Sequence, residues 1–181
     1  VFDGKQPLVA PVNQLQQTFD GNGLVPADFV WDKPYSPLFK YSWKKVYPAL
    51  LETAKVNDLN PFDGIFMQYA NPLTGGHVMQ TMGASMQLLP ASFKGKAHKH
   101  TGSFVYQCAK GSGYSIIDGK RYDWKERDIF CVPSWAWHEH HNDSDTEDAC
   151  LFSFNDLPVI EKLVFYQDKV FTENNGHQIT I

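Results

Sequence analysis

The histidines of this chain are the residues whose chemistry and spacing suggest a functional site. Five of the seven lie in two short segments: "HKH" holds His98 and His100, and "HEHH" holds His138, His140 and His141. In a β-strand, residues two apart point to the same face. If both segments are strands, His98 and His100 aim into one space, and His138 can enter it from the second segment.

Three imidazoles that converge in this way would leave open positions on a bound metal, a ligand set that suits Fe(II), Zn, Ni or Cu. A lone HxH is more often a pair of surface or core histidines, so this prediction depends on both segments together. His141 should point away from His140 along a strand. We assign no function to His141, to His77 after two glycines, or to His177 in a polar tail.

Composition indicates one folded domain, since 181 residues can bury a sizeable core. The net charge of −4 and the lack of a basic patch predict no nucleic-acid or membrane partner. No stretch approaches the ~18 apolar residues of a membrane span, and no signal peptide is visible, so a cytoplasmic protein is the default expectation. The chain starts at Val1, which fits a processed chain or part of a longer one.

The cysteines Cys108, Cys131 and Cys150 are odd in number and form no CxxC pair. This pattern argues against a disulfide framework and against a zinc ribbon. Each cysteine lies in an apolar run, so we expect three buried free thiols.

Proline-rich residues 1–40 predict an extended arm. Apolar residues at helical spacing predict a helix over 41–57, with Pro48 as a kink or as the true start. We therefore divide the chain into an arm with one helix, 1–60, and a β-barrel with a C-terminal tail, 61–181. The tail after 157 can be a short helix or a strand, and its pattern does not decide between them.

Short aromatic and β-branched runs separated by turn residues favour an antiparallel sandwich or barrel. Asp118-Gly119 is a hairpin signal, and "KGSG" at 110–113 is another turn. The expected strands are 64–69, 83–89, 103–109, 113–118, 121–124, 129–132, 136–141 and 149–154.

The segments "HKHTGSFVYQCAKG" and "PSWAWHEHHN" resemble the two sequence motifs of the cupin superfamily. The pattern is departed from in three places: Phe104 stands where the first motif has its glutamate, Trp135 replaces a glycine of the second, and Arg127-Asp128 stand where the leading glycine of the second would be. The resemblance implies an all-β fold, the cupin double-stranded β-helix or jelly-roll barrel, here with an N-terminal arm and one helix.

The wider stretches "YANPLTGGHVMQTMGASMQLLPASFKGKAHKHTGSFVYQ" and "DACLFSFNDLPV" resemble the gentisate 1,2-dioxygenases with their salicylate and hydroxynaphthoate relatives. That family opens an aromatic ring with Fe(II) and O2. The resemblance implies Fe(II) on His98, His100 and His138, a small aromatic acid as substrate, and a homo-oligomer. Without the glutamate the metal keeps its full charge, which favours an anionic chelating substrate.

The resemblance also suggests further site residues. His140 would accept the phenol proton of a substrate that chelates the metal through its hydroxyl and carboxylate. Gln87 and Tyr106 would contact the substrate, although Gln87 can equally form a hydrogen bond inside the barrel. Tyr106 stands where the first cupin of the family has a carboxylate-binding arginine, and a phenol offers no charged bidentate fork.

Family members are usually about twice this length and contain two cupins, and this chain resembles the linker and second cupin. Our interpretation is a ring-cleaving dioxygenase of the gentisate type. Two alternatives stay open: a non-catalytic structural second cupin, or a metal-binding cupin of another chemistry. Metal content and turnover of the isolated chain would separate them.

Overall fold

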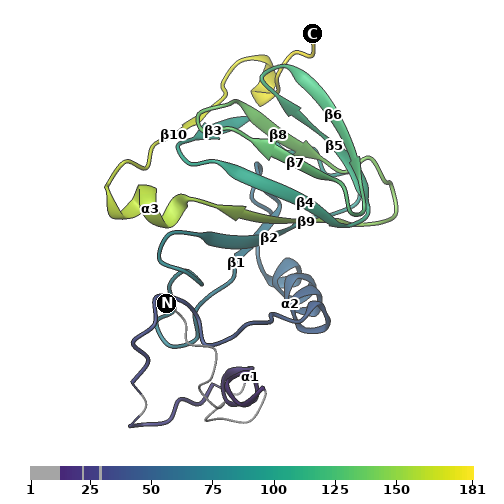
Figure 1. The fold of residues 1–181 in the computed structure, drawn as a ribbon. Coiled ribbons are helices and arrows are strands. Elements are labelled where there is room, and N and C mark those ends of the chain that lie inside the picture. Colours follow the sequence, from purple (N-terminus) through teal and green to yellow (C-terminus); the bar gives the residue numbers. More distant parts are fainter. Residues whose placement is uncertain (1–12, 22, 29) are drawn as a thin grey trace.

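Two five-stranded antiparallel sheets face each other in the protein, seen here in a computed structural model that describes residues 13–21, 23–28 and 30–181 (Figure 1). Their strand orders are β1-β2-β9-β4-β7 and β10-β3-β8-β5-β6. The predominantly β cupin fold is thus confirmed. The strands are β1 (Ile65–Gln68), β2 (Gly83–Leu89), β3 (His98–His100), β4 (Phe104–Lys110), β5 (Ser112–Ile117), β6 (Lys120–Lys125), β7 (Ile129–Val132), β8 (His138–His141), β9 (Ala149–Asn155) and β10 (Asp168–Val170).

The eight expected strands correspond to β1, β2 and β4 to β9. The three-residue strands β3 and β10 were not among them, because so short a run carries little alternation of its own. Asp118 and Gly119 join β5 to β6 with φ of 47° and 77°, the positive values that a tight hairpin turn requires. The turn at 110–113 is a corner and not a hairpin, since β4 and β5 belong to different sheets.

The described residues contain more helix than the single expected one. The helices are α1 (Gln14–Phe19), α2 (Trp43–Val56), α3 (Leu157–Lys162) and the 3₁₀ turn η1 (Asn174–Gly176). Helix α2 begins at Trp43 and contains Pro48, so the proline is not the start. The tail contains both a helix and a strand, α3 and β10. Residues 1–12 of the predicted arm lie outside the described residues. None of these helices is long and apolar enough to cross a membrane.

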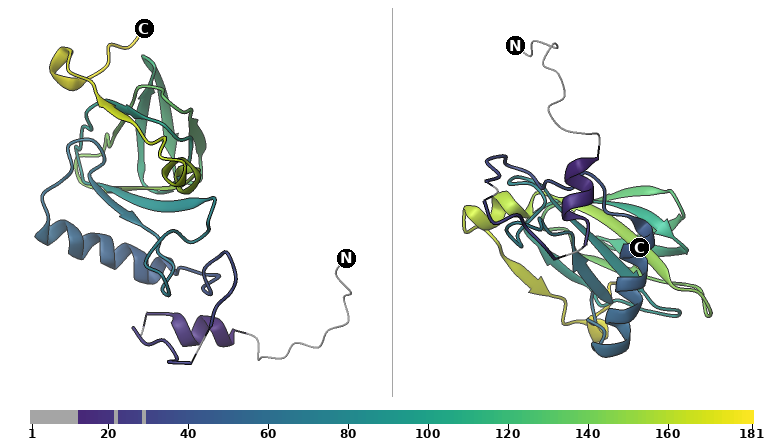
Figure 2. Two further views of the ribbon diagram at one scale, coloured as in Figure 1. Left: turned by 90° about the vertical axis from the view of Figure 1, so that its left-hand side faces the viewer. Right: turned by 90° about the horizontal axis from the view of Figure 1, so that it is seen from below.

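The core has two parts, one on each face of the first sheet. Between the sheets lies the barrel interior, with Leu89, Phe104, Tyr106, Cys108, Ile117, Trp124, Val132, Ala136, Ala149 and Leu151. Under α2 lies a smaller cluster, with Leu50, Ile65, Met86, Leu88 and Cys150. Strand β2 is buried on both faces for this reason, because successive side chains alternate between the two clusters. Figure 2 shows α2 packed outside the barrel, at the end opposite the C-terminus.

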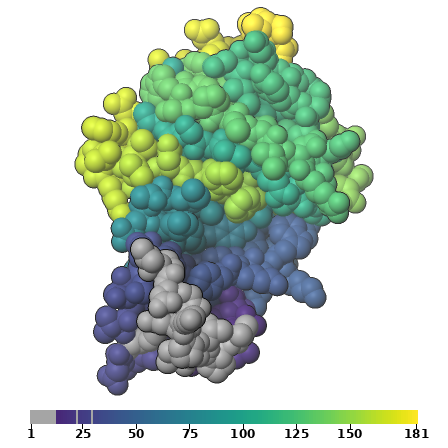
Figure 3. Space-filling view, in the orientation of Figure 1, coloured from purple at the N-terminus to yellow at the C-terminus, as the bar shows by residue number. Residues whose placement is uncertain are grey.

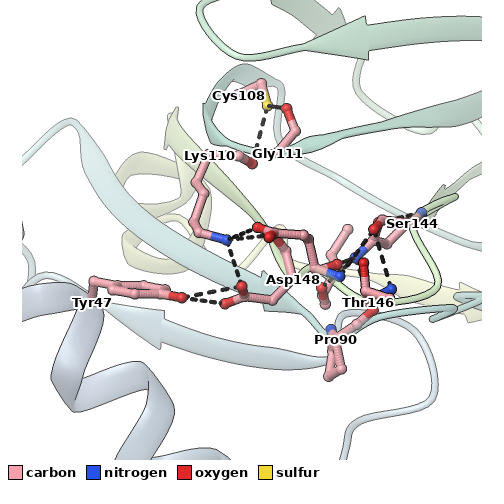
Figure 4. A network of polar contacts seen from close by, with 11 residues as sticks. Tyr47, Pro90, Cys108, Lys110, Gly111, Ser144, Thr146 and Asp148 are labelled. Atoms are coloured by element: carbon pink, nitrogen blue, oxygen red, sulfur yellow. Dashed lines mark hydrogen bonds and ion pairs between the residues drawn. The ribbon is translucent and has the colours of Figure 1, made fainter.

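A polar network fixes α2 against the ends of β4 and β9 (Figure 4). The Tyr47 hydroxyl donates to Asp148 Oδ2 over 2.8 Å, and Lys110 Nζ donates to Asp148 Oδ1 over 2.6 Å. Burial opposes ionisation of Asp148, but these two donors outweigh it and lower the pKa of its carboxyl group. The network is therefore an ion pair with an additional neutral donor from the helix.

The cysteine prediction is correct for two of the three residues. Cys108 lies in the barrel interior and Cys150 lies under α2, and burial raises their thiol pKa values to about 11 and about 12. Cys131 is exposed, contrary to expectation. It lies on the edge strand β7, where Phe130 and Val132 face inward and the residue between them faces out.

Candidate metal centre

Three histidines meet inside the barrel at one end of the second sheet. His98 and His100 lie on β3, and His138 lies on the neighbouring strand β8, in register with His98. Their ring centroids are 4.3 Å (98 to 138), 4.9 Å (100 to 138) and 5.6 Å (98 to 100) apart. One nitrogen from each ring can be chosen so that the three atoms lie within 4.8 Å of one another. The alternation expected from the sequence thus places His98 and His100 on one face, and the pairing of β3 with β8 brings His138 to them.

Hydrogen bonds orient two of these rings toward a common point. His138 Nδ1 donates to the carbonyl of Ala136 over 3.0 Å, and His100 Nδ1 donates to the carbonyl of Thr101 over 3.2 Å. A carbonyl oxygen only accepts, so each Nδ1 holds the proton and each Nε2 keeps its lone pair. His138 Nε2 is buried without a partner. Histidine ligands of metals have this arrangement, with the second nitrogen bonded to a backbone carbonyl.

Burial keeps the three rings neutral. It lowers the pKa of His98 and His100, and it lowers the pKa of His138 far below its usual value. The positive charge that neighbouring histidines would carry adds to the effect on His100 and His138. Neutral imidazole is the form that binds metals. The donor set therefore fits a divalent transition metal.

A carboxylate that sequence reasoning missed lies beside the three histidines. Asp63 Oδ1 is 4.0 Å from His98 Nε2 and accepts a 2.7 Å hydrogen bond from Gln87 Nε2. Burial raises the pKa of Asp63 to about 6. The only sequence signal was the turn around Asn60, whose Oδ1 accepts from the backbone of Phe62 and Asp63. That signal indicates a turn but not its neighbours in space.

Phe104 stands where the cupin motif has its glutamate, and aromatic rings surround this position in the structure. Phe104 packs its ring 4.8 Å from the ring of His100. Tyr106, two residues further along β4, is only 2% exposed and stacks between Phe104 and Phe130. Burial raises the pKa of its phenol well above the usual value. Gln87 is fully buried, with its amide nitrogen bonded to Asp63 and its Oε1 unpartnered.

His140 is part of a hydrogen-bonded chain within the barrel, so it is not an exposed strand end. Its Nδ1 lies 2.7 Å from Ser115 Oγ, which in turn accepts from Trp124 Nε1 over 2.9 Å. Because the indole can only donate, the serine proton is free to go to Nδ1, and the histidine proton then sits on Nε2. Burial lowers the pKa of His140 to about 3, so the ring is neutral.

The two arginines of the chain and the lysines next to His98 in sequence do not face the three histidines. Arg121 pairs with Asp123 and Asp143 on the surface, and the Arg127 side chain is 88% exposed. Lys99 points to the outer face of β3, where its Nζ lies 4.6 Å and 4.5 Å from the ring centroids of Trp135 and Trp137. The stem of Lys96 packs against Gly176 of the tail.

At Trp135, where the second motif has a glycine, the backbone keeps a conformation typical of glycine. Its φ is 66°, in the left-handed region that glycine adopts without strain. The backbone thus keeps the conformation for which the motif has a glycine, and the indole instead covers the ammonium of Lys99.

A cavity of about 510 Å³ lies away from the histidines, between the arm, α2 and β1. Its walls include Phe19, Leu24, Tyr41 and Met67, with Asp20 and Lys45 paired at one side. The lining is mostly apolar and offers no group of ligands for a metal. This cavity is therefore not part of the candidate centre.

Residues 84–155 match the Cupin domain family model, and this segment contains all three histidines. This segment is a cupin domain. The chain is similar to 5-aminosalicylate 1,2-dioxygenase of Comamonas sp, with 38% identity over 79% of this chain and 38% of the relative. It is 36% identical to gentisate 1,2 dioxygenase 1 of Aquipseudomonas alcaligenes over 82% of this chain and 42% of that protein.

Among solved structures, this cupin is similar to salicylate 1,2-dioxygenase of Pseudoaminobacter salicylatoxidans, crystallised with gentisate. The TM-score is 0.78 with 28% identity, over 86% of this chain and 43% of the other. The resemblance to the gentisate dioxygenase family is thus confirmed. The chain spans about two fifths of the length of the curated relatives it matches.

Proposed function

We propose that this cupin holds Fe(II) on His98, His100 and His138 and cleaves the ring of a small hydroxylated aromatic acid with O2. The observation that carries the proposal is the buried His138 Nε2, unpartnered and aimed with two further imidazoles at one point. The iron would supply a Lewis acid and an O2-activating centre. The relatives named for aminosalicylate, gentisate and salicylate support this class of substrate.

The residues around the histidines would position the substrate. Gln87 holds the Asp63 carboxylate beside His98, and its unpartnered Oε1 is available to a donor group of the substrate. Tyr106 forms part of the apolar wall. For His140 we propose a different role from that of the proton acceptor expected from the sequence. With its proton on Nε2, which is buried and unpartnered, it would donate a hydrogen bond to an anionic oxygen of the bound acid.

A second candidate is the non-catalytic structural cupin, and the lack of a cation beside the three histidines among the described residues favours it. A substrate carboxylate in a partly dry site needs a charged partner, yet Tyr106 is buried in an aromatic stack and Lys99 is held between two indoles. A hydrogen bond to a charged group contributes about 1.5–3 kcal/mol, roughly ten- to a hundred-fold in affinity. We therefore expect metal binding with slow or absent cleavage of gentisate by this chain alone.

Oxygen uptake with gentisate and added Fe(II) tests the enzyme hypothesis, with His138→Ala as the control that removes a ligand. Slow turnover that this variant abolishes supports the proposal. Tight iron binding without any turnover would support the structural cupin. Binding of another metal with no O2 consumption would favour a cupin of different chemistry.

We also propose a cytoplasmic homo-oligomer, with an arm and helix over 1–60 and a barrel over 61–181. Exposed apolar side chains support association between copies, since Leu163, Val164 and Phe165 after α3 are 55%, 87% and 62% exposed. Gel filtration of the F165E variant beside the unchanged protein tests this interface, and an unchanged elution volume would count against it.

A further inference from the structure

A second group of potential metal ligands lies on the opposite face of β8. His138 and His140 point into the barrel, so Glu139 and the following His141 point to the outer side of the same strand. There they meet His177, which follows η1 in the C-terminal tail. One ligand atom from each of these three residues lies within 4.8 Å of the others. We propose that Glu139, His141 and His177 bind a zinc ion.

The spacing of the atoms fits coordination better than hydrogen bonding. Glu139 Oε1 is 3.3 Å from His141 Nε2, and Glu139 Oε2 is 3.4 Å from His177 Nδ1. Two atoms bound at about 2.0–2.1 Å to one tetrahedral zinc are roughly 3.3–3.4 Å apart, so each histidine nitrogen lies at this spacing from one of the two carboxylate oxygens. Despite its short distance, the Glu139–His141 pair forms no hydrogen bond, and both of these atoms are buried without a partner.

Two of the three ligands are buried, and their geometry is held from several sides. Glu139 is 1% exposed and His141 is 4% exposed. The ring of Tyr114 stacks on that of His141, with centroids 4.5 Å apart and planes 6° apart. The backbone N–H of Gln178 donates to Glu139 Oε2 over 3.3 Å. A buried carboxylate needs a compensating charge. Among the described residues, Glu139 has ion-pair contacts only with these two histidines.

Two histidines and one glutamate are a ligand set that zinc adopts, with water in the fourth position. The ion would join the tail to the barrel, because the tail contributes His177 and the sheet contributes the other two ligands. The tail already lies against this sheet, because the Gln178 side chain accepts from the Gly119 N–H and donates to the Ile116 carbonyl. Figure 3 shows the yellow C-terminal residues at the top of the molecule, against the green strand region. Zinc would therefore be structural here. The proposal does not depend on ring cleavage at the three histidines inside the barrel.

The test measures the zinc content of a variant that lacks the three-histidine site inside the barrel. The full chain carrying His98→Ala is stripped with chelator, dialysed against limiting Zn²⁺ and analysed by elemental mass spectrometry. We expect about one zinc per chain in H98A and almost none in H98A/H177A. The matched control H98A/H77A removes His77, which pairs with Glu161 and belongs to neither group of ligands. This variant should retain the ion. Zinc-free H98A, or H98A/H177A that still holds one ion, would overturn the proposal.

A second measurement keeps the test independent of whether H98A folds. In the unchanged protein, His177→Ala should lower the zinc content from about two to about one per chain, and Glu139→Gln should do the same without a change of size. Cobalt(II) in place of zinc should give visible bands of a four-coordinate site that weaken in H177A and stay unchanged in H77A. A single ion in the unchanged protein and in H177A alike would refute the second site.

Discussion

His98 and His138 lie directly opposite each other on β3 and β8, with their ring centroids 4.3 Å apart. Cross-strand neighbours on one face are the closest side chains that a sheet can supply. The register between the two strands thus brings His138 to the metal centre, whereas His98 and His100 meet because they are close in sequence. The strand that places His138 inside the barrel also places Glu139 outside it, so one short strand serves both candidate metal sites.

Removal of His138 should abolish metal binding inside the barrel. Loss of an outer hydrogen-bond partner of a ligand costs about 10–100-fold in affinity, and loss of the ligand itself should cost more. We expect His138→Ala to lose Fe(II) in anaerobic equilibrium dialysis, whereas His77→Ala binds as the unchanged protein does. Equal iron affinity in the two variants would contradict the site.

Ser115→Ala should destabilise the protein, because the change leaves both Trp124 Nε1 and His140 Nδ1 buried without the hydroxyl. Each unsatisfied buried group costs about 1–3 kcal/mol. For the two groups together, urea denaturation should show a loss of about 2–6 kcal/mol, and Ser103→Ala at an exposed position should show almost none. If the two variants are equally stable, the hydrogen-bonded chain through Ser115 is not formed.

Tyr106→Arg tests whether the pocket can accept a substrate carboxylate. The position is buried among aromatic rings, so an unpaired arginine there should cost about 3–5 kcal/mol. An aromatic acid in the pocket would pair with it, and gentisate should then raise the melting temperature of the variant much more than that of the unchanged chain. Tyr106→Phe keeps the stack and is the control. Equal responses to gentisate would indicate that the pocket does not admit the acid.

The ion pair between Asp148 and Lys110 should make stability fall in acid. The folded-state pKa of Asp148 lies below its unfolded value of 3.8, so its contribution is complete above that value and is lost as the pH falls through the folded pKa. Asp148→Asn should cost about 1.5–3 kcal/mol at pH 7. The difference from the unchanged protein should shrink below about pH 4. A difference that stays constant from pH 7 to pH 3 would rule out this role.

Cys131 should be the one thiol that reacts quickly in the folded chain. It is exposed, whereas burial raises the pKa of Cys108 and Cys150 and keeps both as thiols. A colorimetric disulfide reagent should therefore titrate about one thiol per native chain and three after denaturation. Cys131→Ser should remove the fast phase, and a fast phase that survives this change would show that a core thiol is accessible.

The parts of the fold that local patterns specify could be predicted. Two-residue alternation placed His98 and His100 on one face, and the Asp118-Gly119 pair formed its hairpin, because both depend on backbone geometry within a few residues. Helix α2 followed for the same reason. The strand alternation also separated His140 from His141.

Contacts between distant segments were decided only by the tertiary structure. Asp63 reaches His98 from a turn that precedes β1, and His177 reaches Glu139 from the tail, across separations that no periodicity describes. The exposure of Cys131 depended on β7 being an edge strand. The sequence by itself determined the inner histidines and the class of fold, since strand geometry is local. The tertiary structure decided which carboxylate stands beside each group of histidines, because that choice depends on how loops and tail pack on the finished barrel.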